Sequence, residues 1–163
     1  MRKVAVKYAL LLALQIAALS AMCACRAADP APEPATEAYS VLLAGYQSGE
    51  HQAGATLISN AEEWQSYWKR HAGWRIPAAP LPVVDFGAQR VIAICAGDRP
   101  TSGWTIEARS VKEFNGELRV QAELRAPAAD ALLPQVVTQP YQILLVARAL
   151  APGEKVVLQL AQR

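Results

Sequence analysis

The chain of 163 residues carries 16 Lys and Arg against 14 Asp and Glu, and 53% of its residues are hydrophobic. Because three of the cations lie in residues 1–24, the remaining chain is close to neutral and has no basic cluster. A near-neutral chain without a row of cations argues against nucleic acid as a partner. Residues 39–163 have the length of a single domain with one hydrophobic core.

Residues 1–24 have the layout of a bacterial export signal of the lipoprotein type. A basic start precedes the nearly uncharged apolar run 8–21, which is short for a membrane span. The run leads into Met22-Cys23-Ala24-Cys25, which resembles a lipoprotein cleavage site with Cys25 as the lipid acceptor. The sequence therefore predicts a protein of the cell envelope, anchored in a membrane through lipid on Cys25. The alternative is cleavage to a soluble periplasmic or secreted protein without lipid on Cys25.

Residues 25–38 are expected to form a tether rich in Ala and Pro. From residue 27 to residue 38 the sequence reads AADPAPEPATEA, with no apolar pattern. Proline disfavours helix and sheet, so such a segment is extended and semi-rigid, at roughly 3 Å per residue. A spacer directly after Cys25 would lift the folded domain clear of a membrane, which supports lipidation.

The first folded elements are predicted to be a hairpin and a helix. Short strands at 41–43 and 55–58 flank a turn-rich segment and would pair with each other. A capping box of Ser59 and Glu62 then starts a helix that ends near residue 71. Trp64 and Trp68 share one face of this helix, where they are expected to anchor the core.

The rest of the chain reads as strands. The run 91–96 lacks polar alternation and indicates a central strand that is covered on both faces. Segments 104–109 and 117–125 alternate around Asn115-Gly116, a hairpin turn signal. Two more strands are predicted at 142–148 and 155–160. The fold class is α+β and β-rich, a mainly antiparallel sheet or sandwich of about seven strands with one amphipathic helix.

No motif in the chain carries catalysis. His51 and His71 are the only histidines, and neither has the spacing of a zinc ligand set. No Gly-x-Ser-x-Gly elbow, phosphate loop or dinucleotide fingerprint is present, and Cys95 lies within an apolar strand. We therefore expect no enzyme activity, no metal and no cofactor. A Ser–His–Asp set assembled only by the fold stays an alternative that sequence spacing does not test.

Several segments together resemble the C-terminal domain of the PrcB family, named for an accessory subunit of a secreted surface protease complex. The resemblance covers roughly residues 57–147. The segments that carry it are Leu81-Pro82 with Asp85-Phe86, Gly97-Asp98-Arg99-Pro100-Thr101-Ser102-Gly103-Trp104, the Asn115-Gly116 turn, and Thr138-Gln139-Pro140-Tyr141. The resemblance implies that residues 39–163 are a single PrcB-like domain and that the protein stabilises or modulates a protease by contact.

The loop Arg99–Trp104 is the candidate partner-binding site. It comprises Arg99, Pro100, Thr101, Ser102, Gly103 and Trp104. Arg99, Thr101 and Ser102 are the expected contact residues, since Trp104 alternates with the next strand's apolar positions and is expected in the core. Where the family favours Thr-Gly-Gly-Tyr this chain has Thr101-Ser102-Gly103-Trp104, so Ser102 must either strain or use a different turn.

The expected partner is a protein, with a protease as the candidate. A weaker likeness, one loop long, links the same residues to chagasin-type cysteine protease inhibitors. Two alternatives therefore stand beside a modulating role. One is direct inhibition of a protease, and the other is a structural envelope lipoprotein without a protease link.

Overall fold

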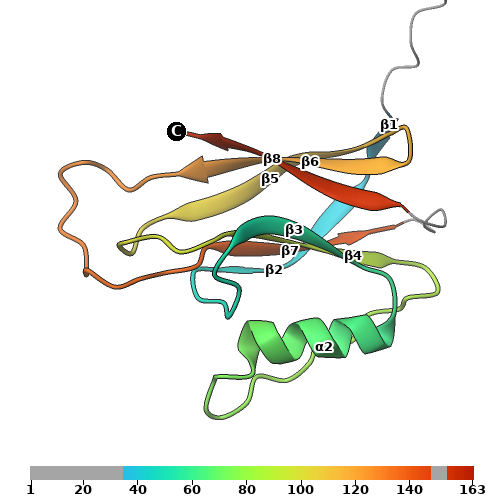
Figure 1. Cartoon of the computed structure of the whole chain (residues 1–163), viewed down its shortest axis with the longest axis horizontal. Coiled ribbons are helices and arrows are strands. Elements are labelled where there is room, and N and C mark those ends of the chain that lie inside the picture. Colours follow the sequence, from blue (N-terminus) through green and yellow to red (C-terminus); the bar gives the residue numbers. More distant parts are fainter. Residues whose placement is uncertain (1–34, 148–153) are drawn as a thin grey trace, which may run out of the picture. The chain divides into compact units, whose positions relative to one another are not determined.

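Two four-stranded sheets face each other in the computed structural model, which describes residues 35–147 and 154–163 (Figure 1). Sheet A has the strand order β1-β5-β6-β8, and sheet B has the order β2-β7-β4-β3. The elements are β1 (Ala35–Glu37), β2 (Tyr39–Gly45), β3 (Ala53–Ile58), α2 (Ala61–Ala72), β4 (Arg90–Ala96), β5 (Thr105–Phe114), β6 (Glu117–Arg125), β7 (Tyr141–Val146) and β8 (Lys155–Gln162). Eight strands and one helix in these residues confirm the predicted β-rich α+β class.

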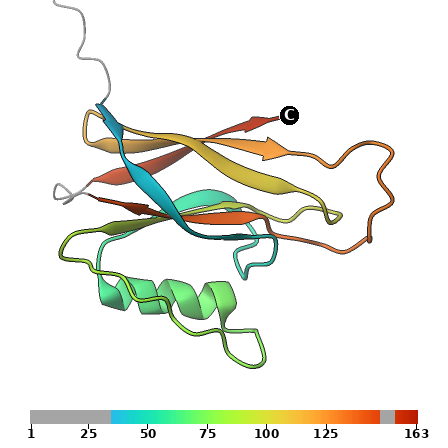
Figure 2. The same cartoon turned by 180° about the vertical axis from the view of Figure 1, so that it is seen from behind.

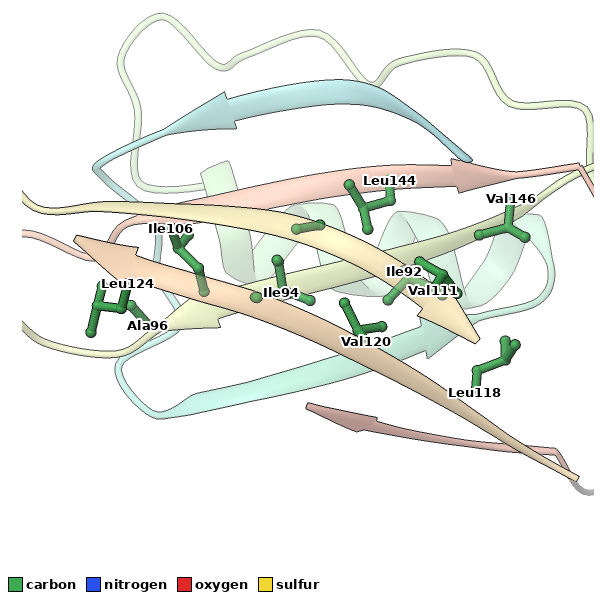
Figure 3. Close-up of a cluster of buried hydrophobic side chains, with 12 residues drawn as sticks. Ile92, Ile94, Ala96, Ile106, Val111, Leu118, Val120, Leu124, Leu144 and Val146 are labelled. Atoms are coloured by element: carbon green, nitrogen blue, oxygen red, sulfur yellow. The ribbon is translucent and has the colours of Figure 1, made fainter. Parts of the chain in front are cut away.

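Sheet B is covered on both faces. Its inner face packs on sheet A around Ile92, Ile94 and Leu144, and Figure 3 shows this cluster between the strands. Its outer face packs on α2, which lies beneath the sheet in Figure 1. The apolar runs 91–96 of β4 and 143–146 of β7 follow from this position, since both faces of these strands are covered. The prediction of a central strand at 91–96 is confirmed.

Helix α2 uses its two tryptophans as predicted. Trp64 and Trp68 are buried against sheet B. Their indole N–H groups donate to the carbonyls of Pro82 (2.8 Å) and Ala79 (3.0 Å). The proline-rich segment 77–82 is thereby fastened along the helix, and the tryptophans serve both as core and as anchors for that segment.

The helix starts with a different cap from the predicted one. Asn60, not Ser59, is the N-cap, and its Oδ1 accepts a hydrogen bond from Glu63 N at 2.9 Å. Glu63 reaches back so that its Oε2 accepts from Ser59 N at 2.7 Å. The reciprocal pattern of a capping box is present but lies one residue further along, because Asn is as good a cap as Ser and both precede the helix.

The turn Asn115-Gly116 joins β5 and β6 as predicted. Asn115 has φ 53° and Gly116 has φ 77°, which suits the right-handed twist of the hairpin. The predicted hairpin of residues 41–58 is wrong. Strand β2 pairs with β7 and β3 pairs with β4, so the two lie at opposite edges of sheet B.

Two further differences concern the ends of the described chain. Ala35–Glu37, assigned to the tether, pairs with β5 as β1 and begins sheet A. From there the chain passes into β2 and so from sheet A to sheet B, a crossing that Figure 2 shows from behind. At the other end, β8 pairs parallel with β6 in an otherwise antiparallel fold. The predicted export signal at residues 1–24, the predicted lipid acceptor Cys25 and the predicted tether up to residue 34 lie outside the described residues.

Candidate functional site

Three connections meet at the end of the sandwich opposite the Asn115-Gly116 turn. They are residues 46–52 between β2 and β3, residues 97–104 between β4 and β5, and residues 126–140 between β6 and β7 (Figures 1 and 2). We call this group the loop end. The candidate loop Arg99–Trp104 lies in the middle connection.

Two glycines frame the middle connection. Gly97 has φ +73°, and a Cβ there would lie 2.7 Å from Ala53 N. Gly103 has φ +86°, and a Cβ there would lie 2.9 Å from the Cβ of Pro127. Positive φ is confined to these two positions within the loop, so Ser102 needs no left-handed conformation. The turn tolerates the serine because Gly103 supplies the unusual φ.

The loop is hydrogen-bonded to the far end of the β6–β7 connection. Arg99 and Thr138 exchange both backbone bonds, at 2.7 and 2.9 Å, and form an isolated antiparallel bridge. The Thr138 hydroxyl donates to the Thr101 carbonyl at 2.9 Å, and Ser102 N donates to the Pro134 carbonyl at 3.3 Å. Two of the segments that carry the family resemblance therefore lie side by side. A loop braced in this way has little freedom to lose on binding.

Asp98 connects all three segments of the loop end. Its Oδ1 accepts from Gln139 Nε2 at 2.7 Å and contacts His51 Nδ1 at 2.9 Å. Its backbone N donates to the His51 carbonyl at 3.1 Å. The hydrogen bonds from Gln139 and then His51 lower the pKa of the Asp98 carboxyl, because both favour its charged form. The ionised Asp98 carboxylate therefore holds the connections 46–52 and 126–140 against the middle connection by hydrogen bonds.

Arg99 and Trp104 form a pair within the loop. The Arg99 guanidinium lies 5.5 Å from the centre of the Trp104 ring, and its Nη2 donates to the Ala96 carbonyl. Trp104 is half-buried and packs against the sandwich cluster, as predicted from its alternation. The structure thus places Arg99, expected as a contact residue, with its charge already engaged by the loop itself.

Thr101 and Ser102 carry the hydroxyl groups of the candidate loop. Both residues are partly exposed, between exposed Pro100 and Gly103. Their backbones are used in bracing, whereas their hydroxyls enter no hydrogen bond among the described residues. These two hydroxyls are the adaptable donors and acceptors that the loop presents.

Sequence reasoning missed several exposed apolar residues in the two connections beside the loop, among them Leu132, which is fully exposed. Tyr46, Val136 and Val137 have exposed fractions of 62%, 43% and 55%. Gln139 N donates to the Tyr46 carbonyl at 2.9 Å, which brings the first connection against the last. No local pattern predicts this gathering, because residues about ninety positions apart are joined only by the fold. These exposed apolar side chains lie in connections that adjoin the braced loop, where they could add apolar area to a contact surface.

A buried serine–histidine pair lies beneath the loop end. Ser48 Oγ and His71 Nδ1 are 2.8 Å apart, but the side chains are only 3% and 0% exposed. Burial, with a smaller contribution from Arg75, lowers the pKa of His71 to about 4. Burial also raises the pKa of the Cys95 thiol, the free cysteine of the described residues. Neither hydroxyl nor thiol is therefore an accessible, activated nucleophile.

Metal and membrane features are few in the part of the chain that is described. No group of three or more His, Cys, Asp or Glu residues is arranged there to hold a metal ion. No helix within residues 35–147 and 154–163 has the length and apolar character of a membrane span. The arrangement at the loop end suits recognition of another molecule by contact.

The comparison with protein families found a match to the middle of the described chain. Residues 90–147 match the PrcB C-terminal family model. The resemblance predicted from the sequence is confirmed over this segment, which begins with β4 and ends just after β7. The matched residues therefore include the candidate loop and the Thr138 and Gln139 braces. No curated protein and no solved structure matches the chain, and the one-loop likeness to chagasin-type inhibitors gains no support.

Proposed function

We propose that the chain is an exported, lipid-anchored, non-catalytic binding protein that stabilises or modulates a protease of the cell envelope. The observation that carries this proposal is the match of residues 90–147 to a family of protease-complex accessory subunits. The matched segment holds the candidate loop Arg99–Trp104 and most of its braces. The neutral charge, the signal-like residues 1–24 and the tether agree with an envelope location.

The contact surface that we propose combines the loop with its apolar neighbours. Thr101 and Ser102 supply hydrogen bonds, while Tyr46, Val136 and Val137 supply apolar area. Arg99 acts from behind the surface by holding Trp104 and the Ala96 carbonyl. Interfaces commonly combine an apolar centre with adaptable polar contacts at its rim.

The loop assignment is tested by capturing partners from envelope extract with the full chain. Thr101→Ala/Ser102→Ala and Val137→Asp should each lower the amount of captured partner at least about tenfold, since the first removes the polar contacts and the second places a charge in the apolar part of the surface. The matched control is Gln65→Ala/Ser66→Ala, which changes two exposed polar residues on α2, away from the loops. Equal capture by the loop variants and the control would refute the loop assignment.

The same preparation separates modulation from inhibition. Adding the purified chain to proteases of the cysteine and serine classes should not lower their turnover of small substrates, because an accessory subunit that binds outside the catalytic cleft leaves the cleft open. A strong drop in turnover that Thr101→Ala/Ser102→Ala removes would favour the inhibitor alternative. Capture of cell-wall proteins alone would favour a structural role.

The lipid anchor is tested at Cys25. Cys25→Ala should release the protein from membranes in cell fractionation, because one or more buried acyl chains contribute about 0.8 kcal/mol per methylene to membrane affinity. Cys23→Ala is the matched control and should leave the protein bound. A Cys25→Ala protein that stays in the membrane fraction would contradict lipidation at this residue.

A further inference from the structure

Among residues 35–147 and 154–163, no strand pairs with the outer edge of β8, which leaves sheet A with a long open edge. The register of β8 with β6 runs without a shift from Glu117↔Lys155 to Leu124↔Gln162. No proline, glycine or charge interrupts it from Val156 to Gln162. The other edges are interrupted or short: β1 has three residues, β2 has a register shift between Val41 and Leu43, and β3 contains Gly54. Soluble proteins usually protect a long edge with such devices, so β8 is the exception in this fold.

The free backbone groups of β8 can be assigned from the bonds that flank it. Lys155 N donates to the Gly116 carbonyl at 3.4 Å, and Arg163 N donates to the Leu124 carbonyl at 3.0 Å. Odd-numbered residues of β8 therefore direct their backbone toward β6. Because direction alternates along a strand, Val156, Leu158 and Leu160 direct their N–H and C=O groups away from the sheet. Strand β3 lies across the sandwich in sheet B and does not pair with them.

The side chains of these same residues are only partly covered. Val156, Leu158 and Leu160 pack against the sandwich cluster but are not fully buried. On the opposite face, Val157 and Gln159 are exposed. A further strand beside β8 would cover the side chains of Val156, Leu158 and Leu160 and would also accept hydrogen bonds from, and donate them to, their free backbone groups.

We propose that β8 pairs antiparallel with β8 of a second copy of this chain. A two-fold axis through Leu158 sets Leu158 opposite its own counterpart and Val156 opposite Leu160. Since the Val156–Leu160 pairing occurs twice, three residue pairs have their backbone groups directed toward each other. The two residues of each pair exchange two backbone hydrogen bonds, about six in all.

The sequence of β8 is self-complementary in this register. The inner face brings only Val and Leu together, and the outer face sets Val157 opposite Gln159, so no like charges oppose each other. Sheet A of one copy then continues into sheet A of the other. This neutral complementarity selects a second copy as the occupant of the edge.

The register is tested by charges placed on the outer face of β8. In Val157→Glu/Gln159→Glu, each introduced carboxylate lies directly opposite another carboxylate of the second copy. In Val157→Glu/Gln159→Lys, each introduced carboxylate lies opposite an ammonium. Both variants place the first carboxylate beside Arg119 of β6 within one copy, and within that copy they differ only in the charge at position 159, which pairs with Gln121.

The measurement is sedimentation velocity of the full chain in a mild detergent over a wide concentration range. The natural chain should dimerise, and the Glu/Glu variant should dissociate at least about tenfold more readily than the Glu/Lys variant. Added salt should narrow this difference. A natural chain that is monomeric at every concentration, equal dissociation constants for the two variants, or an edge that takes a strand from another protein instead would each overturn the proposal.

Discussion

His71 is a polar residue enclosed almost entirely by aromatic rings. Tyr67 stacks on its imidazole with centroids 5.6 Å apart, and Tyr141 meets it edge-on at 4.4 Å. Ser48 Oγ is hydrogen-bonded to Nδ1, whereas Nε2 has no hydrogen-bond partner among the described residues. A charged imidazolium would lack a counter-ion here, which is why burial lowers the pKa of His71 to about 4.

The protein should lose stability in acid because of His71. His71 binds a proton near pH 6.5 in the unfolded chain and only near pH 4 in the folded chain. Its contribution to the free energy of unfolding is therefore fully present above pH 6.5 and is lost as the pH falls toward 4. The free energy of unfolding should drop by about 2–3 kcal/mol from pH 7.5 to pH 4.5, as measured by urea titration. His71→Phe should abolish most of this slope, whereas Ser48→Ala should keep it. An unchanged slope in His71→Phe would assign the acid sensitivity to another group.

At the scale of elements, the start of α2 shows how local chemistry fixes a boundary. Ser59 and Asn60 are both good caps, and Glu62 and Glu63 are both suitable partners, so the sequence permits two registers. The structure selects Asn60 with Glu63. This register turns Trp64, Tyr67 and Trp68 toward sheet B together.

Two alanine substitutions distinguish the registers. Asn60→Ala should lower the free energy of unfolding by about 1 kcal/mol, because Glu63 N loses its acceptor. Ser59→Ala should change it by less than about 0.5 kcal/mol, since the Ser59 side chain caps nothing. Chemical denaturation measures both values. The reverse order would restore the cap predicted from the sequence.

At the scale of the whole molecule, one polar link joins the two sheets through their apolar interface. The register of β5 shifts between Ala108 and Ser110, which disturbs the ladder there. Gln142 of sheet B reaches across, and its Oε1 accepts from Ala108 N at 2.8 Å. The Tyr39 hydroxyl donates to the Ala108 carbonyl at 2.9 Å. Both backbone polar groups of Ala108 are thus hydrogen-bonded to side chains of the opposite sheet.

Removing the hydrogen bond between Gln142 and Ala108 should destabilise the fold. Gln142→Met keeps the length of the side chain but leaves the buried Ala108 N–H without an acceptor, so the free energy of unfolding should fall by about 1–3 kcal/mol. Gln65→Met on the exposed face of α2 is the matched control and should stay within about 0.5 kcal/mol. Thermal and urea unfolding would report the difference. A Gln142→Met protein as stable as the control would mean that the sheets are joined by apolar packing alone.

Local sequence patterns predicted most of the helix and strand positions, but they did not predict which strands distant in the sequence pair. The apolar run of β4 and the Asn115-Gly116 turn each contain their own explanation, so the central strand and the hairpin were predictable. The strands of the expected 41–58 hairpin fit many neighbours, and only the assembled sheet shows that β2 belongs beside β7. The candidate loop was predictable as a segment. Its bridge from Arg99 to Thr138 was not, because no periodicity connects residues so far apart.

The segment that matches the family model supplies the inner strands of both sheets, β5 and β6 in one and β4 and β7 in the other. Strands from outside the match occupy the four edges. The match therefore covers an inner frame of four strands, and each edge of that frame carries one flanking strand from outside the match. The connection that carries Tyr46 and His51 joins two such flanking strands. Because both of these strands lie outside the matched segment, proteins that share only the inner frame are expected to differ from this chain at Tyr46 and His51.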